Sequence, residues 1–408
     1  MVFYFQGERQ CRYFYHYAMN KKYPIMIIGV AILIKVFLLY FSIVRVPEAR
    51  LVRDSYIYLN AGEAIVSAGE FASRGPDGTL QSDFFIAPGY PFFLVVLHWL
   101  LGIPLAGVIL IQVILTVLAA FIAYKTAMEI DHRLGFLSLA ILLYSPAITM
   151  FSLLILTESL FLLFITLFMF YFVKYLKAGR VRFVVLAGLM FAAAVYVRPG
   201  PYLLGIAVAA FVIYANVTHK MKTAVFHAFI LLAVSYGLLG LWQLRNYLVF
   251  HKAVFSSIIS MDVVTGGAFG GLFHSYPRNQ DPLTQGVPPV LYYINVTWRC
   301  ALSLFTRPGT FKYLHSPLLA LTGKIFSYVV MAFWMGGFFY GITKIRRNIY
   351  YQFLLLIIIC FACGTIIVEM WNVGERYRVP MMPFIAIISA YGWTSLFSLK
   401  KAARISGG

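Results

Sequence analysis

The run PLAGVILIQVILTVLAAFIAYKTA, residues 104–127, is almost wholly apolar and contains one charged side chain, Lys125. An α-helix needs about 20 apolar residues to cross the hydrocarbon core of a bilayer, so this run predicts a membrane-spanning helix. The whole chain has the same character, because 62% of its residues are hydrophobic and 12% are charged, whereas soluble domains carry about 25% charged residues. We therefore expect an integral membrane protein.

Further runs of similar length and composition divide the chain. They lie at residues 24–44, 134–150, 158–176, 183–197, 199–217, 224–245, 317–342, 351–370 and 380–399. The sequence thus predicts an all-α polytopic membrane protein in which residues 1–408 form a single transmembrane domain with no separate soluble domain. One run, PGYPFFLVVLHWLLG at residues 88–102, fits poorly, because it is short and begins with two prolines, which interrupt helices. A count of ten spans and a count of eleven are both open at this point.

The distribution of Lys and Arg favours the lower count. Cytoplasmic loops carry an excess of these residues, and the basic clusters all fall on one side if residues 88–102 do not cross the membrane. The clusters lie at Lys21–Lys22, Lys125–Arg133, Lys174–Arg182, Lys220–Lys222, Lys344–Arg347 and Lys400–Lys401. We therefore favour about ten spans, with both termini cytoplasmic and residues 88–102 as an interfacial or re-entrant element. Two large loops, 45–87 and about 246–316, then face the extracytoplasmic side, and the first contains short juxtamembrane helices.

The net charge of +19 lies in short loops between apolar runs. Nucleic acid binding would need a clustered basic face, so we expect contact with membrane lipids and no nucleic acid partner. We expect the protein in a bacterial inner (plasma) membrane, with an active site on the outward side, because the remaining polar residues gather there. Polar groups at membrane depth are costly and usually functional.

Two carboxylates on this outer side are candidate catalytic groups. Asp54 lies in RDSYIYLNAGEAIVSAGEF, residues 53–71, where a carboxylate can take a proton from a hydroxyl or hold a divalent cation. The alternative is that Asp54 caps the following helix. Glu158 is a lone acid between two apolar runs, and its alternative role is to complement the dipole of a helix capped by Thr157. Because paired carboxylates assemble metal sites and general bases, we treat the two as a catalytic or metal-binding pair.

Basic residues supply the complementary half of the predicted site. Arg198, Arg245, Arg376 and Arg378 all lie at predicted outer helix ends, and guanidinium groups bind phosphate through bidentate hydrogen bonds. Arg376 and Arg378 would share one face of an extended segment. Lys35 lies near the middle of the first span, where a charge costs about 2.5–3.5 kcal/mol, and it could face a cavity or a lipid phosphate. The alternative for each is that the side chain reaches the lipid headgroups.

In chain order, several segments resemble the GT-C superfamily of integral-membrane glycosyltransferases, and in particular the branch of the protein O-mannosyltransferases and lipid A aminoarabinose transferases. The segments are RDSYIYLNAGEAIVSAGEF, APGYPFFLVVLHWLLG, LYSPAITMFSLLILTESLFLLF, YVRPGPYLL, LWQLRNYLVF and GERYRVPMMPFIAIISAYG. The resemblance covers nearly the whole chain. It implies a GT-C-like fold and a polyprenyl-phosphate-linked sugar donor, used on the outer face without a nucleotide cofactor.

By this resemblance, Asp54 matches the catalytic aspartate of the first outer loop and Glu158 the second acidic position, which in some members is a metal-associated aspartate. Arg376 and Arg378 fall in the late arginine motif near the donor phosphate. The chain departs from the family pattern where Glu158 replaces an aspartate and where PGYP replaces a histidine-diproline entry. These departures leave the use of a divalent cation and the class of acceptor open.

The predicted function is transfer of a sugar from a polyprenyl-phosphate donor to an acceptor hydroxyl, with inversion and with Asp54 as base or metal ligand. The acceptor could be a glycan, a lipid or a protein. One alternative is a transporter or flippase for a lipid-linked saccharide, although such proteins commonly show internal repeats that this sequence lacks. Another is a polysaccharide polymerase or ligase, for which residues 246–316 would supply the large outer loop.

Overall fold

The computed structural model describes residues 22–45, 51–74, 80–82, 84–216, 221–256, 289–309, 317–345, 348–369 and 374–406. Within these ranges the chain is helical apart from one short hairpin, in which β1 (Ala72–Arg74) pairs antiparallel with β2 (Leu80–Ser82). The predicted all-α membrane class is therefore confirmed. Parts of both predicted outer loops, residues 46–50, 75–79, 257–288 and 310–316 among them, lie outside the described residues.

The helices follow the apolar runs of the sequence. The first span is α2 (Lys22–Arg45), and the amphipathic helix α3 (Arg53–Ala68) comes next. The others, in chain order, are α4 (Gly89–Leu94), the π-helix η2 (Val95–Leu100), α5 (Leu105–Ile130), the 3₁₀ turn η3 (His132–Leu134), α6 (Gly135–Leu143), α7 (Pro146–Ser152), α8 (Glu158–Ala178), α9 (Val181–Val197), α10 (Leu204–Asn216), α11 (Met221–Phe250), α14 (Pro289–Thr306), α15 (Pro317–Lys344), α16 (Ile349–Glu369), α17 (Glu375–Arg378), the 3₁₀ turn η5 (Val379–Met381) and α18 (Met382–Ser406).

Length and composition identify six helices among the described residues that can cross a membrane, or seven if α6 and α7, which meet at a 55° bend, form one broken span. The apolar part of α2 and the helices α9 and α10 are shorter and occupy the remaining predicted spans. Residues Gly89–Leu100 form a helical element of about 18 Å at 1.5 Å per residue. That is less than the hydrocarbon thickness of about 30 Å, so this element is too short to cross.

One helix falls where the sequence predicts only an outer loop. Helix α14, with the sequence PVLYYINVTWRCALSLFT, lies within residues 246–316. Its polar residues interrupt every apolar run before it reaches spanning length, so its sequence does not predict a membrane span. The helix is amphipathic, as expected for an element that lies against the bundle or the membrane surface.

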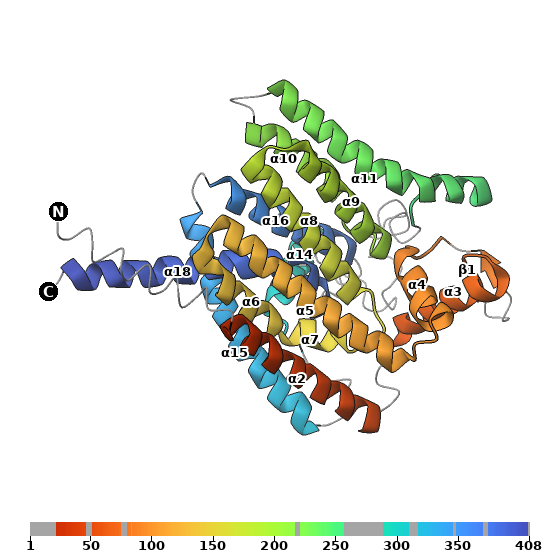
Figure 1. The fold of residues 1–408 in the computed structure, drawn as a ribbon, viewed down its shortest axis with the longest axis horizontal. Coiled ribbons are helices and arrows are strands. Elements are labelled where there is room, and N and C mark those ends of the chain that lie inside the picture. The colour runs from red at the N-terminus through yellow and green to blue at the C-terminus, as the bar shows by residue number, and fades with distance from the viewer. Residues whose placement is uncertain are drawn as a thin grey trace.

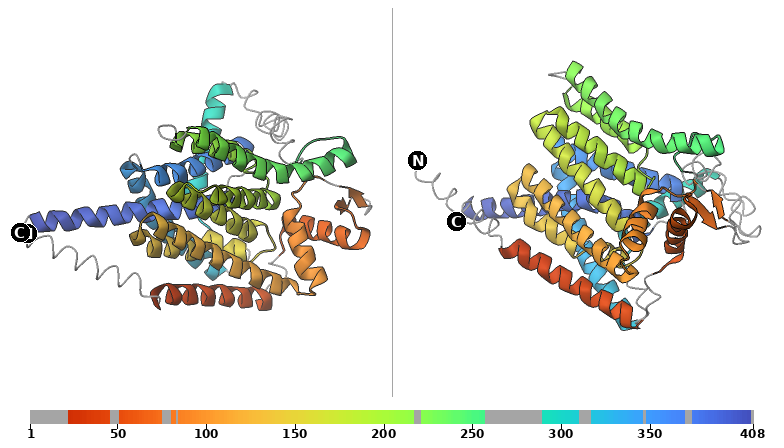
Figure 2. Two further views of the ribbon diagram at one scale, coloured as in Figure 1. Left: turned by 45° about the horizontal axis from the view of Figure 1, so that its top comes forward. Right: turned by 45° about the vertical axis from the view of Figure 1, so that its right-hand side comes forward.

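The bundle has two distinct ends. Helices α3 and α4 lie with β1 at one end, whereas α18 extends beyond the bundle at the opposite end (Figure 1). The turned views of Figure 2 show the same arrangement. One contiguous apolar core, which includes Leu39, Phe172 and Ile385, joins the helices between these ends.

A glycine-lined contact joins α15 to α18. A Cβ on Gly341 would lie 2.5 Å from the carbonyl oxygen of Ile388 and 3.1 Å from its Cγ2 atom, and Gly392 of α18 lies directly against Gly337. Small residues allow two helices to approach this closely in a membrane. Because α18 follows directly on α17 and η5, the contact also fixes the segment that precedes it.

Replacing Gly341 by alanine tests this contact. We expect Gly341→Ala to lower the midpoint of thermal unfolding in detergent, because an overpacked contact costs about 1–3 kcal/mol. The matched control is Gly364→Ala in α16, where an added Cβ meets nothing within 4 Å and should not lower the midpoint. Equal midpoints for the two variants would contradict the assigned role of Gly341.

Candidate active site

Asp54 lies in the first turn of α3, and its carboxylate is not used to cap that helix. The N-cap residue is Val52, whose backbone N–H donates to Ser55 Oγ at 3.0 Å, while the Ser55 N–H donates to the Val52 carbonyl at 2.8 Å. Asp54 therefore does not cap α3, and the alternative interpretation of this residue was wrong. Its side chain is 40% exposed and is free to face residues from other parts of the chain.

Glu158 is the first residue of α8, and its side chain is only 2% exposed. Thr157 precedes it as the N-cap residue but makes no capping hydrogen bond with its side chain; its hydroxyl donates instead to Glu158 Oε2 at 3.4 Å. The other carboxylate oxygen, Oε1, accepts a hydrogen bond from Arg198 Nη1 at 3.0 Å. Arg198 has an extended backbone at the C-cap of α9, so the break between two spans delivers this guanidinium to the start of α8.

Arg376, in the short helix α17, joins the two carboxylates. Its Nε donates to Glu158 Oε1, and its Nη1 donates to Asp54 Oδ2. Asp54, Glu158, Arg198 and Arg376 therefore form one connected group, which we call the acid–arginine cluster. Two carboxylates and two guanidinium groups give it a formal charge of zero. Its inner member, Glu158, is buried, whereas Arg198 and Arg376 are about one-fifth exposed and Asp54 is more exposed still.

Tyr58, which the sequence analysis missed, also faces this cluster. It follows Asp54 by four residues on α3, and residues with this spacing lie on one face of a helix. Burial raises the pKa of the Tyr58 phenol above its ordinary value, and the positive charge of Arg376 opposes that change. The ring packs edge-to-face on Tyr90 at 5.1 Å. The four-residue spacing from Asp54 is the signal that could have identified Tyr58.

A second group of polar contacts supports the cluster from inside the bundle. The Tyr90 hydroxyl donates to Gln112 Oε1 at 2.6 Å, and Gln112 Nε2 donates to the Leu154 carbonyl at 2.6 Å. These bonds tie α4 and α5 to the segment that leads into Glu158. The contact of the Arg198 guanidinium with the Tyr377 ring, at 5.3 Å, links the cluster to α17 as well.

Arg378 does not join the cluster. Its Nη1 donates to the carbonyls of Leu304 and Phe305 at 2.8 and 3.1 Å, and its Nη2 donates to the Arg307 carbonyl at 2.9 Å. The prediction that Arg376 and Arg378 share one face of an extended segment was wrong, because residues 375–378 are helical and side chains two positions apart on a helix point in different directions. Arg378 therefore binds the C-terminal end of α14.

Arg245 and Lys35 also lie in other contacts. Arg245 Nη2 donates to the Phe71 carbonyl at 3.2 Å, and the guanidinium stacks on Trp242 at 4.9 Å, so it joins α11 to the start of the hairpin. Lys35 is 1% exposed, and its Nζ donates to Thr149 Oγ1 at 3.1 Å on α7. A phosphate-binding role for Arg245, Lys35 and Arg378 stays a prediction.

The two carboxylates do not fit a divalent cation in this arrangement. Oxygen ligands lie about 2.0–2.6 Å from such an ion, but the Arg376 guanidinium already occupies the position between Asp54 and Glu158. A dication added to the neutral cluster would be a buried, uncompensated double charge, which is costly. Among the described residues, no group of three or more His, Cys, Asp or Glu side chains is placed to hold a metal ion.

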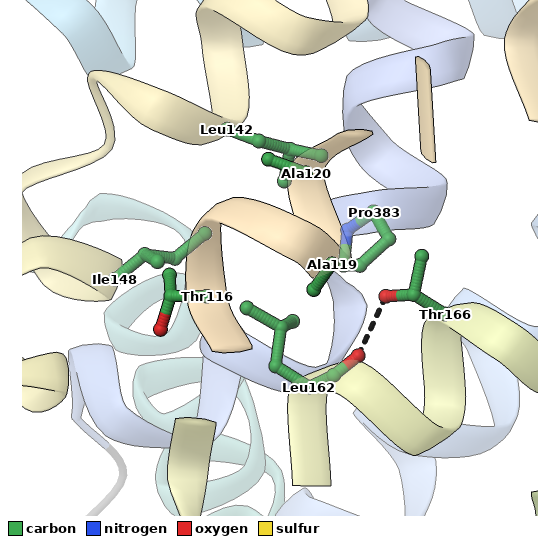
Figure 3. Close-up of a pocket in the computed structure, with 8 residues that line it drawn as sticks. All are labelled: Thr116, Ala119, Ala120, Leu142, Ile148, Leu162, Thr166 and Pro383. Atoms are coloured by element: carbon green, nitrogen blue, oxygen red, sulfur yellow. Dashed lines mark hydrogen bonds between the residues drawn. The ribbon is translucent and has the colours of Figure 1, made fainter. Parts of the chain in front are cut away.

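Figure 3 shows a pocket lined by residues of α5, α6, α7, α8 and α18. It lies inside the bundle, lined mostly by apolar side chains such as Ala119, Leu162 and Pro383, and it leaves no room for a water molecule. Its two polar members are satisfied, because the Thr166 hydroxyl donates to the Leu162 carbonyl at 2.6 Å and the Thr116 hydroxyl donates to the Gln112 carbonyl at 2.9 Å. The pocket is a packing gap rather than a binding site.

The chain is similar in fold to a solved membrane oligosaccharyltransferase, in agreement with the GT-C-like fold that the sequence predicts. Residues 86–240, less than half of the chain, match the family model described as dolichyl-phosphate-mannose-protein mannosyltransferase. No curated protein matches the chain significantly.

Three solved structures illustrate the likeness. The oligosaccharyltransferase AglB from Archaeoglobus fulgidus, in complex with an inhibitory peptide and a dolichol-phosphate, aligns with a TM-score of 0.56 at 16% identity, over 95% of this chain and 52% of AglB. The same archaeal enzyme in complex with Zn and sulfate aligns with a TM-score of 0.54 at 16% identity, over 91% of this chain and 49% of the enzyme. ArnT from Cupriavidus metallidurans, bound to undecaprenyl phosphate, aligns with a TM-score of 0.41 at 13% sequence identity. That alignment covers 91% of this chain and 77% of ArnT. The chain thus spans about half the length of the archaeal enzyme, with which it shares a fold.

Removing the charge of Glu158 tests the cluster as a structural unit. We expect Glu158→Gln to destabilise the protein by about 3–5 kcal/mol, because it leaves two guanidinium groups without their buried partner. The readout is the midpoint of thermal unfolding in detergent. The control is Glu63→Gln, at an exposed carboxylate of α3, and an equal midpoint for both variants would show that the cluster does not hold the helices together.

The variant Arg378→Gln tests whether Arg378 caps the C-terminal end of α14 or binds the donor phosphate. Because the Arg378 side chain is 2% exposed and bound to three carbonyls, we expect a lower unfolding midpoint with no selective rise in the KM for a lipid-phosphate donor. A raised donor KM at an unchanged unfolding midpoint would instead support the phosphate-binding prediction.

Proposed function

We propose that the protein is an enzyme that transfers a sugar from a polyprenyl-phosphate-linked donor to an acceptor hydroxyl, with inversion, at the extracytoplasmic membrane face. The acid–arginine cluster is the observation that carries this proposal. It combines a partly exposed carboxylate, Asp54, with two partly exposed guanidinium groups. The transfer needs a group that accepts a proton and groups that stabilise a leaving phosphate, and the cluster contains both.

In the proposed reaction, Asp54 accepts the proton of the acceptor hydroxyl while the acceptor oxygen bonds to the anomeric carbon. The bond between that carbon and the phosphate oxygen breaks, and polyprenyl phosphate leaves with one more negative charge. Arg376 and Arg198 would bind this leaving group, since guanidinium and phosphate form strong paired hydrogen bonds. The general base contributes about 10²- to 10⁴-fold to such a rate, and stabilisation of the developing charge is usually the larger effect.

Charge at the two ends of the bundle supports an outward-facing site. Lys177 Nζ donates to Glu129 Oε2 at 2.8 Å, which joins the C-terminal ends of α8 and α5 among the basic residues of their loops. The acid–arginine cluster lies instead at the N-terminal end of α8. Because cytoplasmic loops are the basic ones, the cluster belongs on the opposite, extracytoplasmic side.

The comparisons support the class of donor and leave the acceptor open. The matching family is described by a dolichyl-phosphate-mannose donor, and the archaeal enzyme was solved with a dolichol-phosphate and a peptide. We therefore propose a polyprenyl-phosphate sugar as donor, membrane lipids as the surrounding solvent, and a glycan, lipid or protein as acceptor. No step of the proposal uses a nucleotide.

Transfer by the purified protein tests the proposal. Incubation with a radiolabelled polyprenyl-phosphate sugar and a membrane extract should give a new glycosylated product. Asp54→Asn should lower the rate by about 10²-fold or more, with folding and donor binding retained, because the amide cannot accept the proton. The control Glu63→Gln, on the same helix, should keep the wild-type rate.

The outcomes distinguish the alternative functions. Movement of the labelled lipid across a vesicle membrane without a glycosylated product would identify a carrier rather than a transferase. A product that grows by repeated addition would identify a polymerase. Turnover of Asp54→Asn at the wild-type rate would remove Asp54 from the reaction while leaving the transfer itself intact.

A further inference from the structure

The position of the Arg376 guanidinium carries an inference about the chemistry of the site, one that rests on the proposed transfer. Arg376 contacts both carboxylates at once, through two different nitrogens. A divalent cation shared by Asp54 and Glu158 would have to lie between the two carboxylates, where the guanidinium already lies. The guanidinium and the cation are therefore mutually exclusive occupants.

The second arginine strengthens the argument. Arg198 donates to the same Glu158 oxygen that accepts from Arg376, so a dication in the wild-type protein would face two guanidinium groups in a region where Glu158 is 2% exposed. Without Arg376, two carboxylates would face one guanidinium group, which leaves a net negative charge for a dication. Repulsion between like charges is poorly screened at such a buried site.

We propose that Arg376 is the resident cation of this site and that sugar transfer by this protein is independent of divalent metal ions. The guanidinium holds Asp54 beside Glu158, as a shared metal ion would hold two carboxylates. It also offers N–H groups to the departing phosphate. The carboxylate pair is therefore complete without a metal.

Arg376→Ala supplies a gain-of-binding test that needs neither donor nor acceptor. The full-length protein in detergent is titrated with Mn²⁺, and bound ion is measured from the loss of the free-ion electron paramagnetic resonance signal. Wild type should show no site that depends on Asp54 and Glu158. Arg376→Ala should gain one Mn²⁺ site, and the triple variant Arg376→Ala, Asp54→Asn, Glu158→Gln should lose it again.

Activity gives an independent readout. Treatment of the wild-type protein with a chelator should leave the transfer rate unchanged, with no rise on addition of Mn²⁺, Mg²⁺ or Zn²⁺. A chelator-induced loss of about 10²-fold that one of these ions restores, the size expected for removal of a charge-stabilising group, would overturn the proposal. So would Mn²⁺ binding to wild type that Asp54→Asn and Glu158→Gln abolish.

Two further outcomes are decisive. If Arg376→Ala folds, as judged by gel filtration, but gains no Mn²⁺ site, Arg376 does not hold the position of a cation. If it does not fold, Arg376→Lys keeps the charge and should likewise bind no Mn²⁺, while the wild-type measurements stand unaffected. A complete failure to detect transfer would count against the proposed function, but the Mn²⁺ titration would still decide the role of Arg376.

Discussion

One end of this helical bundle depends on one guanidinium group placed between two carboxylates. Two carboxylates brought together repel, and one of them would take up a proton unless a positive charge lies between them. Arg376 provides that charge for Glu158 and Asp54, which lie 218 and 322 residues away in the sequence. The interaction thus joins the first outer segment, the middle of the chain and the last span into one site.

The bundle explains how such distant residues meet. Three of the four cluster residues stand at or beside the end of a span: Glu158 at the start of α8, Arg198 at the end of α9, and Arg376 just before α18. The fourth, Asp54, lies in the first turn of α3. In a membrane, helix ends are restricted to two levels, because a span must have a length that matches the hydrocarbon. Residues at ends on the same side are therefore close in depth before any specific contact forms. Helix packing, such as that of α15 on α18, then sets their lateral distances.

The same argument explains how much the sequence could predict. Apolar runs and basic clusters were enough to place the spans, and to put Asp54, Glu158, Arg198 and Arg376 on one side of the membrane. They could not tell which arginines on that side meet the acids, because lateral position depends on packing. Arg245 and Arg378 satisfied the same sequence criterion, yet they bind the carbonyls of Phe71 and of the α14 end. The error over Arg378 came from treating a one-turn helix as extended chain, and one turn is too short to show a periodicity.

The capping of α14 by Arg378 has a mechanical consequence. Three hydrogen bonds attach the end of the amphipathic helix α14 to the side chain of Arg378, which lies only two positions from Arg376. The Arg307 and Glu375 side chains add a contact of 3.9 Å between the same two segments. A shift of α14 relative to the bundle must therefore move the backbone of residues 375–378 with it or break this attachment. The position of α14 is thereby coupled to the acid pair through a few residues of backbone next to Arg376.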